Sequence, residues 1–167
     1  MKKFKMTLAT AALAMLAVGS MLSMNSCKKD PCKDETCNDK GTPTANGDVC
    51  DCACNTGYEG DKCETEMRTK FVGTYAYNES CTSGTDTYTV SVATSSSSIT
   101  EVSINNLYNQ GIIVKGTVSG TALTIASQPF GSATISGTGS ISGNTLSLSY
   151  SVSLGGATDA CSGSGTK

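Results

Sequence analysis

This 167-residue chain contains nine cysteines, and they are its most chemically informative residues because of how they are spaced. One cysteine stands alone, six lie within 32 residues, and two lie far apart in the C-terminal part. A cysteine can form a disulfide, carry a lipid or, as a thiolate, hold a metal ion. The three groups are Cys27; Cys32, Cys37, Cys50, Cys52, Cys54 and Cys63; and Cys81 and Cys161.

The absence of histidine removes several catalytic arrangements. A serine or cysteine nucleophile activated by imidazole cannot be built, and neither can a zinc or copper site that relies on imidazole ligands. Two carboxylates could in principle flank a sugar, as in glycosidases. We expect the few acids after residue 70 to lie near turns or on the polar face of strands, where they are solvated. We therefore predict a protein that is not an enzyme and has no cofactor; these acids are Glu79, Asp86, Glu101 and Asp159.

The first 26 residues have the order of a secretory signal. A basic start with three lysines leads into an apolar run over residues 8–22 and then into small polar residues. A membrane-spanning helix is the alternative interpretation, but it needs about 20 apolar residues. This run is shorter and is broken by Gly19 and Ser20. We expect residues 1–26 to be removed as a signal peptide.

The segment Met24-Asn25-Ser26-Cys27 ends this signal and resembles the relaxed lipobox of Bacteroidetes-type lipoproteins. The resemblance implies that Cys27 becomes the first residue, that its sulfur carries a diacylglycerol, and that residues 27–31 form a lipidated tether. Two or more acyl chains give stable anchoring. In similar lipoproteins, acidic residues after the anchor direct export to the cell surface, so we expect an outer-membrane location that faces outward. The charges at residues 28–35 are mixed in sign, and a merely solvated tether is the alternative.

The net charge limits the classes of partner that the protein can bind. Without the three signal lysines, nine basic residues remain against 14 acidic ones, so the processed chain has a net charge of about −5. No basic stripe for nucleic acid is present. We expect the membrane to be a partner through the lipid anchor, extracellular proteins or glycans to be further partners, and nucleic acid to be none.

The six clustered cysteines predict a small disulfide framework over residues 32–64. A segment this short cannot bury enough apolar surface by itself, and exported chains meet oxidising conditions. Asn46-Gly47 is a strong hairpin-turn signal. A thiolate metal site at Cys50, Cys52 and Cys54 is the competing interpretation, but it would need reduced sulfurs. From spacing alone, all 15 pairings of six cysteines are open.

The end of this segment resembles the second half of an EGF-like domain. Cys52-x-Cys54 is followed after eight residues by Cys63, with Gly57-Tyr58-Glu59-Gly60 between them. The resemblance implies that Gly57 and Gly60 form tight turns and that Tyr58 covers the last bridge. It also implies bridges from the first cysteine to the third, the second to the fourth and the fifth to the sixth, which are Cys32–Cys50, Cys37–Cys52 and Cys54–Cys63.

Residues 71–167, which follow a charged linker at 65–70, predict an antiparallel β domain. Serine and threonine make up 35 of these 97 residues, a density that could also indicate a disordered stalk. Apolar residues nevertheless alternate with polar ones, as in Leu146, Leu148 and Tyr150, and this period of two is typical of strands with one buried face. Glycine-containing turns recur throughout. The pattern predicts about eight strands at 70–77, 86–94, 98–106, 111–118, 121–127, 132–140, 144–153 and 158–165.

Short connections favour neighbouring antiparallel strands, hence an up-and-down β-barrel or sandwich. A Cys81–Cys161 bridge would require the first and last strands to approach each other within about 7 Å between Cα atoms. A meander whose end strands meet is a closed barrel without free edges. The expected fold is thus all-β, with a small disulfide-rich EGF-like module followed by this β domain.

The start of the β domain, Phe71-Val72-Gly73-Thr74-Tyr75, resembles the Gly-x-Trp start of lipocalin-like barrels. The whole chain resembles small Bacteroidetes-type surface lipoproteins. We predict a non-enzymatic, lipid-anchored cell-envelope protein that displays its β domain for contact with proteins or glycans. The alternative is a lipocalin-like carrier of a small apolar ligand inside the barrel. The candidate inward residues, for which packing in a core is the more ordinary role, are Phe71, Tyr75, Tyr88, Val90, Ile104, Ile125, Leu148 and Tyr150.

Overall fold

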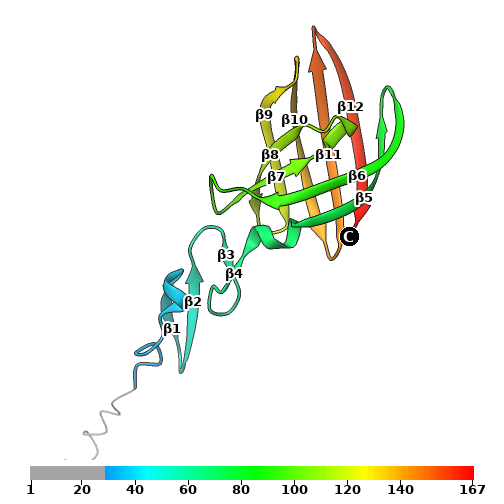
Figure 1. Cartoon of the computed structure of the whole chain (residues 1–167). Coiled ribbons are helices and arrows are strands. Elements are labelled where there is room, and N and C mark those ends of the chain that lie inside the picture. Colours follow the sequence, from blue (N-terminus) through cyan, green and yellow to red (C-terminus); the bar gives the residue numbers. More distant parts are fainter. Residues whose placement is uncertain (1–28) are drawn as a thin grey trace, which may run out of the picture.

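The computed structural model describes residues 29–167 and contains only strands, 3-10 turns and loops within them. A small cysteine-rich module lies at one end of a larger β-barrel (Figure 1). The module contains η1 (Cys37–Asp39), β1 (Gly41–Asn46), β2 (Val49–Cys54), β3 (Tyr58–Glu59) and β4 (Thr65–Glu66). The 3-10 turn η2 (Met67–Phe71) leads into the barrel. The all-β expectation, with a disulfide-rich module followed by an antiparallel β domain, is confirmed.

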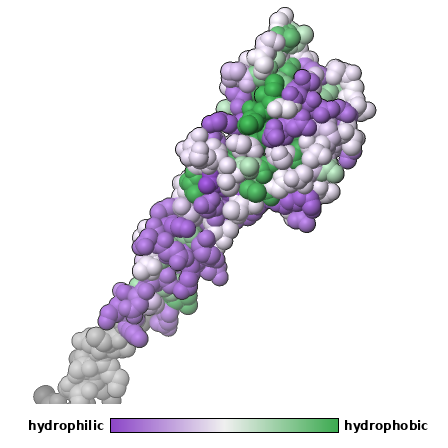
Figure 2. All heavy atoms as spheres, viewed as in Figure 1, coloured by the Kyte–Doolittle hydropathy of each residue, from purple (hydrophilic) through white to green (hydrophobic). Residues whose placement is uncertain are grey.

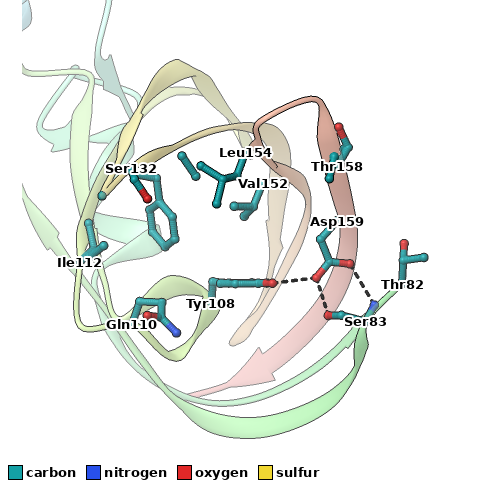
Figure 3. Close-up of a pocket in the computed structure, with 14 residues that line it drawn as sticks. Thr82, Ser83, Tyr108, Gln110, Ile112, Ser132, Val152, Leu154, Thr158 and Asp159 are labelled. Carbon is teal, nitrogen blue, oxygen red and sulfur yellow. Dashed lines mark hydrogen bonds between the residues drawn. The ribbon is translucent and has the colours of Figure 1, made fainter.

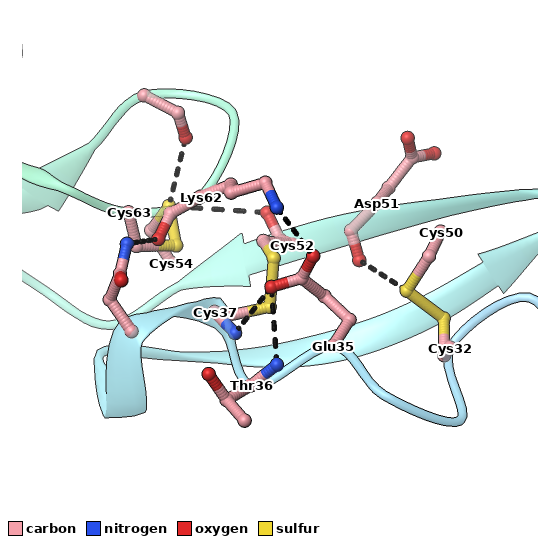
Figure 4. The surroundings of a disulfide bond; sticks show 12 residues. Cys32, Glu35, Thr36, Cys37, Cys50, Asp51, Cys52, Cys54, Lys62 and Cys63 are labelled. Atoms are coloured by element: carbon pink, nitrogen blue, oxygen red, sulfur yellow. Dashed lines mark hydrogen bonds and ion pairs between the residues drawn. A yellow bond between two sulfur atoms is a disulfide. The ribbon is translucent and has the colours of Figure 1, made fainter.

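Disulfides take the place of an apolar core in the module. β1 and β2 form a hairpin that turns at Gly47 and Asp48. The three bridges of the module join Cys32 to Cys50, Cys37 to Cys52 and Cys54 to Cys63. Figure 4 shows them grouped around the hairpin. Cys37 and Cys63 are fully buried, so sulfur atoms occupy the interior that apolar side chains fill in larger domains.

The connector between module and barrel, expected as a charged linker, is tightly hydrogen-bonded. The Met67 amide donates to the Gly57 carbonyl oxygen at 2.9 Å. Arg68 Nη1 donates to the carbonyl oxygens of Ser95, Ser98 and Glu101 at 2.6, 2.7 and 3.2 Å. One guanidinium thereby holds the loop at residues 95–100 against η2, and the module joins the barrel through fixed contacts.

The β domain is a closed eight-stranded antiparallel barrel, so the sandwich alternative does not apply. Each strand pairs with the next along the chain, and the last pairs with the first. Cys81 lies directly opposite Cys161 in that closing pair, and a disulfide joins them. The barrel strands are β5 (Gly73–Cys81), β6 (Gly84–Thr94), β7 (Glu101–Asn105), β8 (Ile113–Ser119), β9 (Ala122–Phe130), β10 (Ala133–Ser142), β11 (Thr145–Leu154) and β12 (Ala157–Thr166).

Several strand boundaries differ from the prediction by three or four residues, and two of these differences have a clear physical reason. β5 continues to Cys81 instead of ending near residue 77, because its polar residues 78–80 pair with both β6 and β12. β7 begins at Glu101, since Arg68 holds residues 95–100 as a loop. The first of these differences decides where Glu79 lies.

Glycines on alternate strands make room for large side chains inside the barrel. A Cβ atom at Gly163 would lie 2.5 Å from the Asn78 carbonyl oxygen and 2.8 Å from the Tyr77 ring. A Cβ atom at Gly139 would lie 2.4 Å from Leu148. This exchange of small against large residues fills the interior, as is common in narrow barrels. All eight candidate inward side chains lie in the resulting core.

The barrel end next to the module is closed by side chains. Phe71 is fully buried there, and its carbonyl oxygen accepts a hydrogen bond from the Tyr75 hydroxyl at 2.6 Å. Lys167 Nζ donates to the carbonyl oxygens of Lys70 and Val72, both at 2.7 Å. Side chains therefore fill the barrel at this end.

Glycine at an inward position should be required for stability. We expect Gly163→Val to lower the free energy of unfolding by at least ~1–3 kcal/mol, because overpacking forces backbone and ring shifts. The effect opposes the higher strand propensity of valine. Urea unfolding measures the difference, with Ser164→Val as the matched control on the exposed face of the same strand. Equal stabilities for the two variants would contradict the steric explanation.

Candidate ligand-binding site

The barrel end far from the module carries a cavity of about 620 Å³. Four connections surround it, namely the turns after β5, β9 and β11 and the longer segment between β7 and β8. The apolar part of its wall comes from Ile112, Phe130, Val152 and Leu154. Figure 3 looks into this cavity and shows Val152 and Leu154 facing Ile112 across it.

Tyr108 extends across the mouth of the barrel. Its hydroxyl donates a hydrogen bond to Asp159 Oδ2 at 2.7 Å, so the β7–β8 segment is linked to β12 on the other side (Figure 3). The Tyr108 ring meets Phe130 and Tyr150 edge-on, with centroids 6.1 and 6.4 Å apart. The ring therefore forms part of the floor and wall of the cavity.

The backbone that presents Tyr108 is unusual. Asn106, Tyr108 and Asn109 have φ values of 65°, 60° and 51°, in the left-handed region that non-glycine residues seldom adopt. The segment contains η3 (Leu107–Asn109), and the Tyr108 amide donates to the Tyr88 hydroxyl at 2.9 Å. Asn106 Oδ1 accepts from the Gly111 amide at 2.8 Å. Backbone strain of this kind is often found at functional sites.

Asp159 is fixed by a set of donors. Its Oδ1 accepts from the Ser83 amide at 3.0 Å, and its Oδ2 accepts from the Ser83 hydroxyl at 2.5 Å. These bonds, led by that of the Ser83 hydroxyl and followed by that of Tyr108, lower the pKa of Asp159 below its usual value. The same bond to Asp159 raises the pKa of Tyr108. Asp159 therefore stays ionised at neutral pH and holds Tyr108 in place.

A carboxyl group lies inside the barrel beneath Tyr108. Glu79, expected on a polar face or near a turn, points inward and is only 7 % exposed, so that expectation was wrong. Its Oε1 accepts hydrogen bonds from the hydroxyls of Tyr88, at 2.8 Å, and Tyr150. The change of face follows from the extension of β5, because Tyr75, Tyr77, Glu79 and Cys81 then alternate inward.

The tyrosines around Glu79 are held neutral. Burial is the main cause that raises the pKa values of Tyr77, Tyr88 and Tyr150 well above the ordinary range. Tyr77 also has a buried hydroxyl with no hydrogen-bond partner among residues 29–167. The interior is thus a polar centre of one carboxyl group and three phenols within an apolar core.

The other two acids of the β domain lie apart from this centre. Asp86 is exposed near the mouth, where its Oδ2 accepts from Asn109 Nδ2 at 2.9 Å. Glu101 lies at the closed end and pairs with Lys115 at 3.0 Å. Its pKa is lowered, first by the Ser95 hydroxyl and then by Lys115. Because Glu101 lies at the opposite end, the four acids do not form one site.

The expected residues of the cysteine-rich module occupy its turns. Gly57 and Gly60 have φ values of 95° and 97°, which favour glycine. A Cβ atom at Gly57 would lie 2.7 Å from Ile99 of the barrel, so this turn also needs space at the joint. Tyr58 is half-buried, with Lys40 Nζ 4.7 Å from its ring centroid.

Two groups of potential metal ligands occur in the described part of the chain. They are Glu35 with Cys37 and Cys52, and Glu79 with Cys81 and Cys161. All four sulfurs are in disulfides, so none is available as a thiolate. Figure 4 shows Glu35 instead paired with Lys62, at 3.0 Å.

Cys27, the expected lipid-bearing residue, and the signal at 1–26 lie outside residues 29–167, which the structure describes. Between residues 29 and 167, no helix has the length and apolar character needed to cross a bilayer.

The bonds from Ser83 and Tyr108 to Asp159 should make stability depend on acid pH. A lowered pKa in the folded state stabilises the fold above the unfolded-state pKa of about 3.9, and this contribution disappears as pH falls through the folded-state pKa. We therefore expect Asp159→Asn to be less stable than the wild type at neutral pH, and the difference to shrink in acid. Urea unfolding at several pH values measures this. A difference independent of pH would contradict it.

Comparison with known proteins gave no match to any family model, curated protein or solved structure.

Proposed function

We propose that this chain is a non-enzymatic, lipid-anchored cell-envelope protein whose barrel binds a small, partly apolar ligand at the mouth far from the anchor. One observation carries the proposal. The barrel is closed by Phe71 and Lys167 at the module end, whereas a cavity of about 620 Å³ opens at the other.

The cavity has the size and composition of a small-molecule site. Ligand pockets usually have volumes of about 300–1,000 Å³ and apolar walls with a few placed polar groups. Here Phe130 and Val152 supply the apolar wall, and Tyr108 and Asp159 supply the polar groups. Because core side chains fill the barrel below, the ligand binds in the mouth and does not enter the full length of the barrel.

The carboxyl groups support binding over catalysis. Asp159 is occupied by Ser83 and Tyr108, and Glu79 accepts from two tyrosine hydroxyls. Glu101 lies at the closed end beside Lys115. Glu79 and Asp86 line one pocket, but the sequence contains no histidine to act as a base.

The module suits the role of a spacer between membrane and barrel. Figure 1 shows the described chain beginning at the far end of the module, so an anchor at Cys27 would leave the open mouth pointing away from the membrane. The contacts of Arg68 and the ion pair of Lys70 with Glu59, at 2.6 Å, stiffen the joint. Four disulfides agree with an exported protein.

Contact with a protein or glycan is the second candidate function, and exposed apolar side chains near the mouth favour it. Ile113 and Leu154 are 61 % and 55 % exposed. Figure 2 shows apolar atoms gathered on the barrel, while the surface of the module is mostly hydrophilic. Such side chains can contribute to a contact surface.

Ligand binding can be tested with residues 29–167 exported without the anchor, since this part contains the whole core and all four disulfides. We expect an added neutral fluorescent amphiphile to bind, as measured by native mass spectrometry and fluorescence. Leu154→Arg should weaken binding about tenfold or more, because it places a charge on the cavity wall. Ile113→Arg, similarly exposed but outside the cavity, is the matched control.

An empty protein that binds no probe would refute the proposal. Saturable binding to matrix proteins or glycans lost in Ile113→Arg would favour the second candidate.

The anchor has its own test. In cells fed a palmitate analogue, the full chain should become labelled and fractionate with the outer membrane, because acylation of Cys27 supplies the lipid. The Cys27→Ala chain should stay unlabelled. Equal labelling of both chains would remove the anchor from the proposal.

A further inference from the structure

We infer that the ligand of the distal mouth is a cationic amphiphile, a small molecule with an apolar body and a protonated amine head; this inference rests on the proposed function. Tyr108 divides the mouth into two compartments that together fit such a molecule. The first is the apolar cavity of about 620 Å³. The second is a neighbouring polar pocket of about 320 Å³.

The polar pocket shares part of its wall with the apolar cavity. Tyr108, Ser83 and Gln110 line both compartments, so the two are adjacent. Glu79 and Asp86 line only the polar pocket. A ligand seated over Tyr108 would place its apolar part against Phe130 and Val152 and its head toward these two carboxyl groups.

Charge is distributed unequally between the ends of the barrel. Residues 71–167 contain four acids and only two basic residues. Glu79, Asp86 and Asp159 lie at the open end. Lys115 is paired with Glu101 near the closed end, and Lys167 is bound to backbone carbonyls there. The open mouth therefore has acidic groups without a basic neighbour from the barrel, and a cleft lined by one sign of charge attracts the opposite sign.

Glu79 offers an unused acceptor to this pocket. Both tyrosine hydroxyls donate to Oε1, and no group of residues 29–167 donates to Oε2. The side chain is 7 % exposed and lines the polar pocket, so this pocket gives access to its remaining oxygen. An ammonium group has three donors, and one of them can donate to this oxygen.

The aromatic rings also favour a cation. A head group seated where the two compartments meet lies beside Tyr108, which lines both, and cations are attracted to aromatic faces within about 6 Å. An anionic head would meet Asp159 and Asp86 instead, and like charges repel. The arrangement thus discriminates between ligands by the sign of the head group.

Three probes with one apolar body and different heads test the inference, namely phenylbutylamine, phenylbutanol and phenylbutyrate. Isothermal titration calorimetry with residues 29–167 should give the tightest binding for the amine. We expect it to exceed the alcohol about tenfold at low salt, which corresponds to about 1.4 kcal/mol. Phenylbutyrate should bind more weakly than the alcohol. Added salt should reduce the advantage of the amine, because exposed charges are screened.

Charge-neutralising variants locate the source of the preference. Asp86→Asn and Glu79→Gln should each reduce amine affinity severalfold and leave the affinity for the alcohol nearly unchanged. Glu101→Gln removes the same charge at the closed end and should change neither. Glutamine keeps an oxygen that can accept from Tyr88 and Tyr150, and thermal unfolding checks that each variant is folded.

The outcomes separate this inference from the proposed function. If none of the three probes binds, both the ligand class and the proposed pocket fail. If the alcohol or the acid binds as well as the amine, the pocket stands and the cationic class is refuted. An amine preference that persists unchanged in both Asp86→Asn and Glu79→Gln also refutes the role of these carboxyl groups.

Discussion

Pairing of the first barrel strand with the last is the constraint on which the rest of this structure depends. Every other strand pair in the barrel joins neighbours along the chain through a connection of at most seven residues. The β5–β12 pair instead closes a loop of 80 residues, and the Cys81–Cys161 disulfide fixes it. In the chain-entropy model, a bridge over such a loop stabilises the fold by ~4–5 kcal/mol. Closure also removes the two free edges of the sheet.

Closure of the barrel determines which side chains face its interior. Once β12 lies beside β5, the ring of Tyr77 must share space with Gly163, and Glu79 must point into the barrel next to Tyr150. The polar centre around Glu79 therefore forms only when the strands close into a barrel, and no local stretch of sequence specifies it. The open mouth depends on it as well, because the Ser83–Asp159 contact joins the turn after β5 to β12.

Sequence patterns predicted the strands and disulfides of the fold but not the candidate binding site. Alternation and turn spacing predicted eight strands close to those observed, because most inward positions are apolar and each turn contains glycine or a small polar residue. The four disulfides join the pairs that the cysteine count and the EGF-like resemblance implied. Glu79 was misplaced, although its two-residue spacing from Tyr77 and Cys81 was a usable signal. Tyr108 lies in a segment of left-handed non-glycine residues, for which periodicity has no signature, so neither its position nor the cavity could be foreseen.

The barrel is filled by side chains at the module end and open at the other end. This difference determines which of its segments could be engineered. The four connections around the mouth carry the cavity, whereas the closing side chains, the Arg68 joint and most of the core lie elsewhere. Three of these connections are turns of only two residues that join paired strands. The turns after β9 and β11 could be lengthened one at a time with the strand pairs kept, whereas the turn after β5 carries Ser83, which holds Asp159. A barrel of this kind is thus a natural frame for engineering new binding specificities.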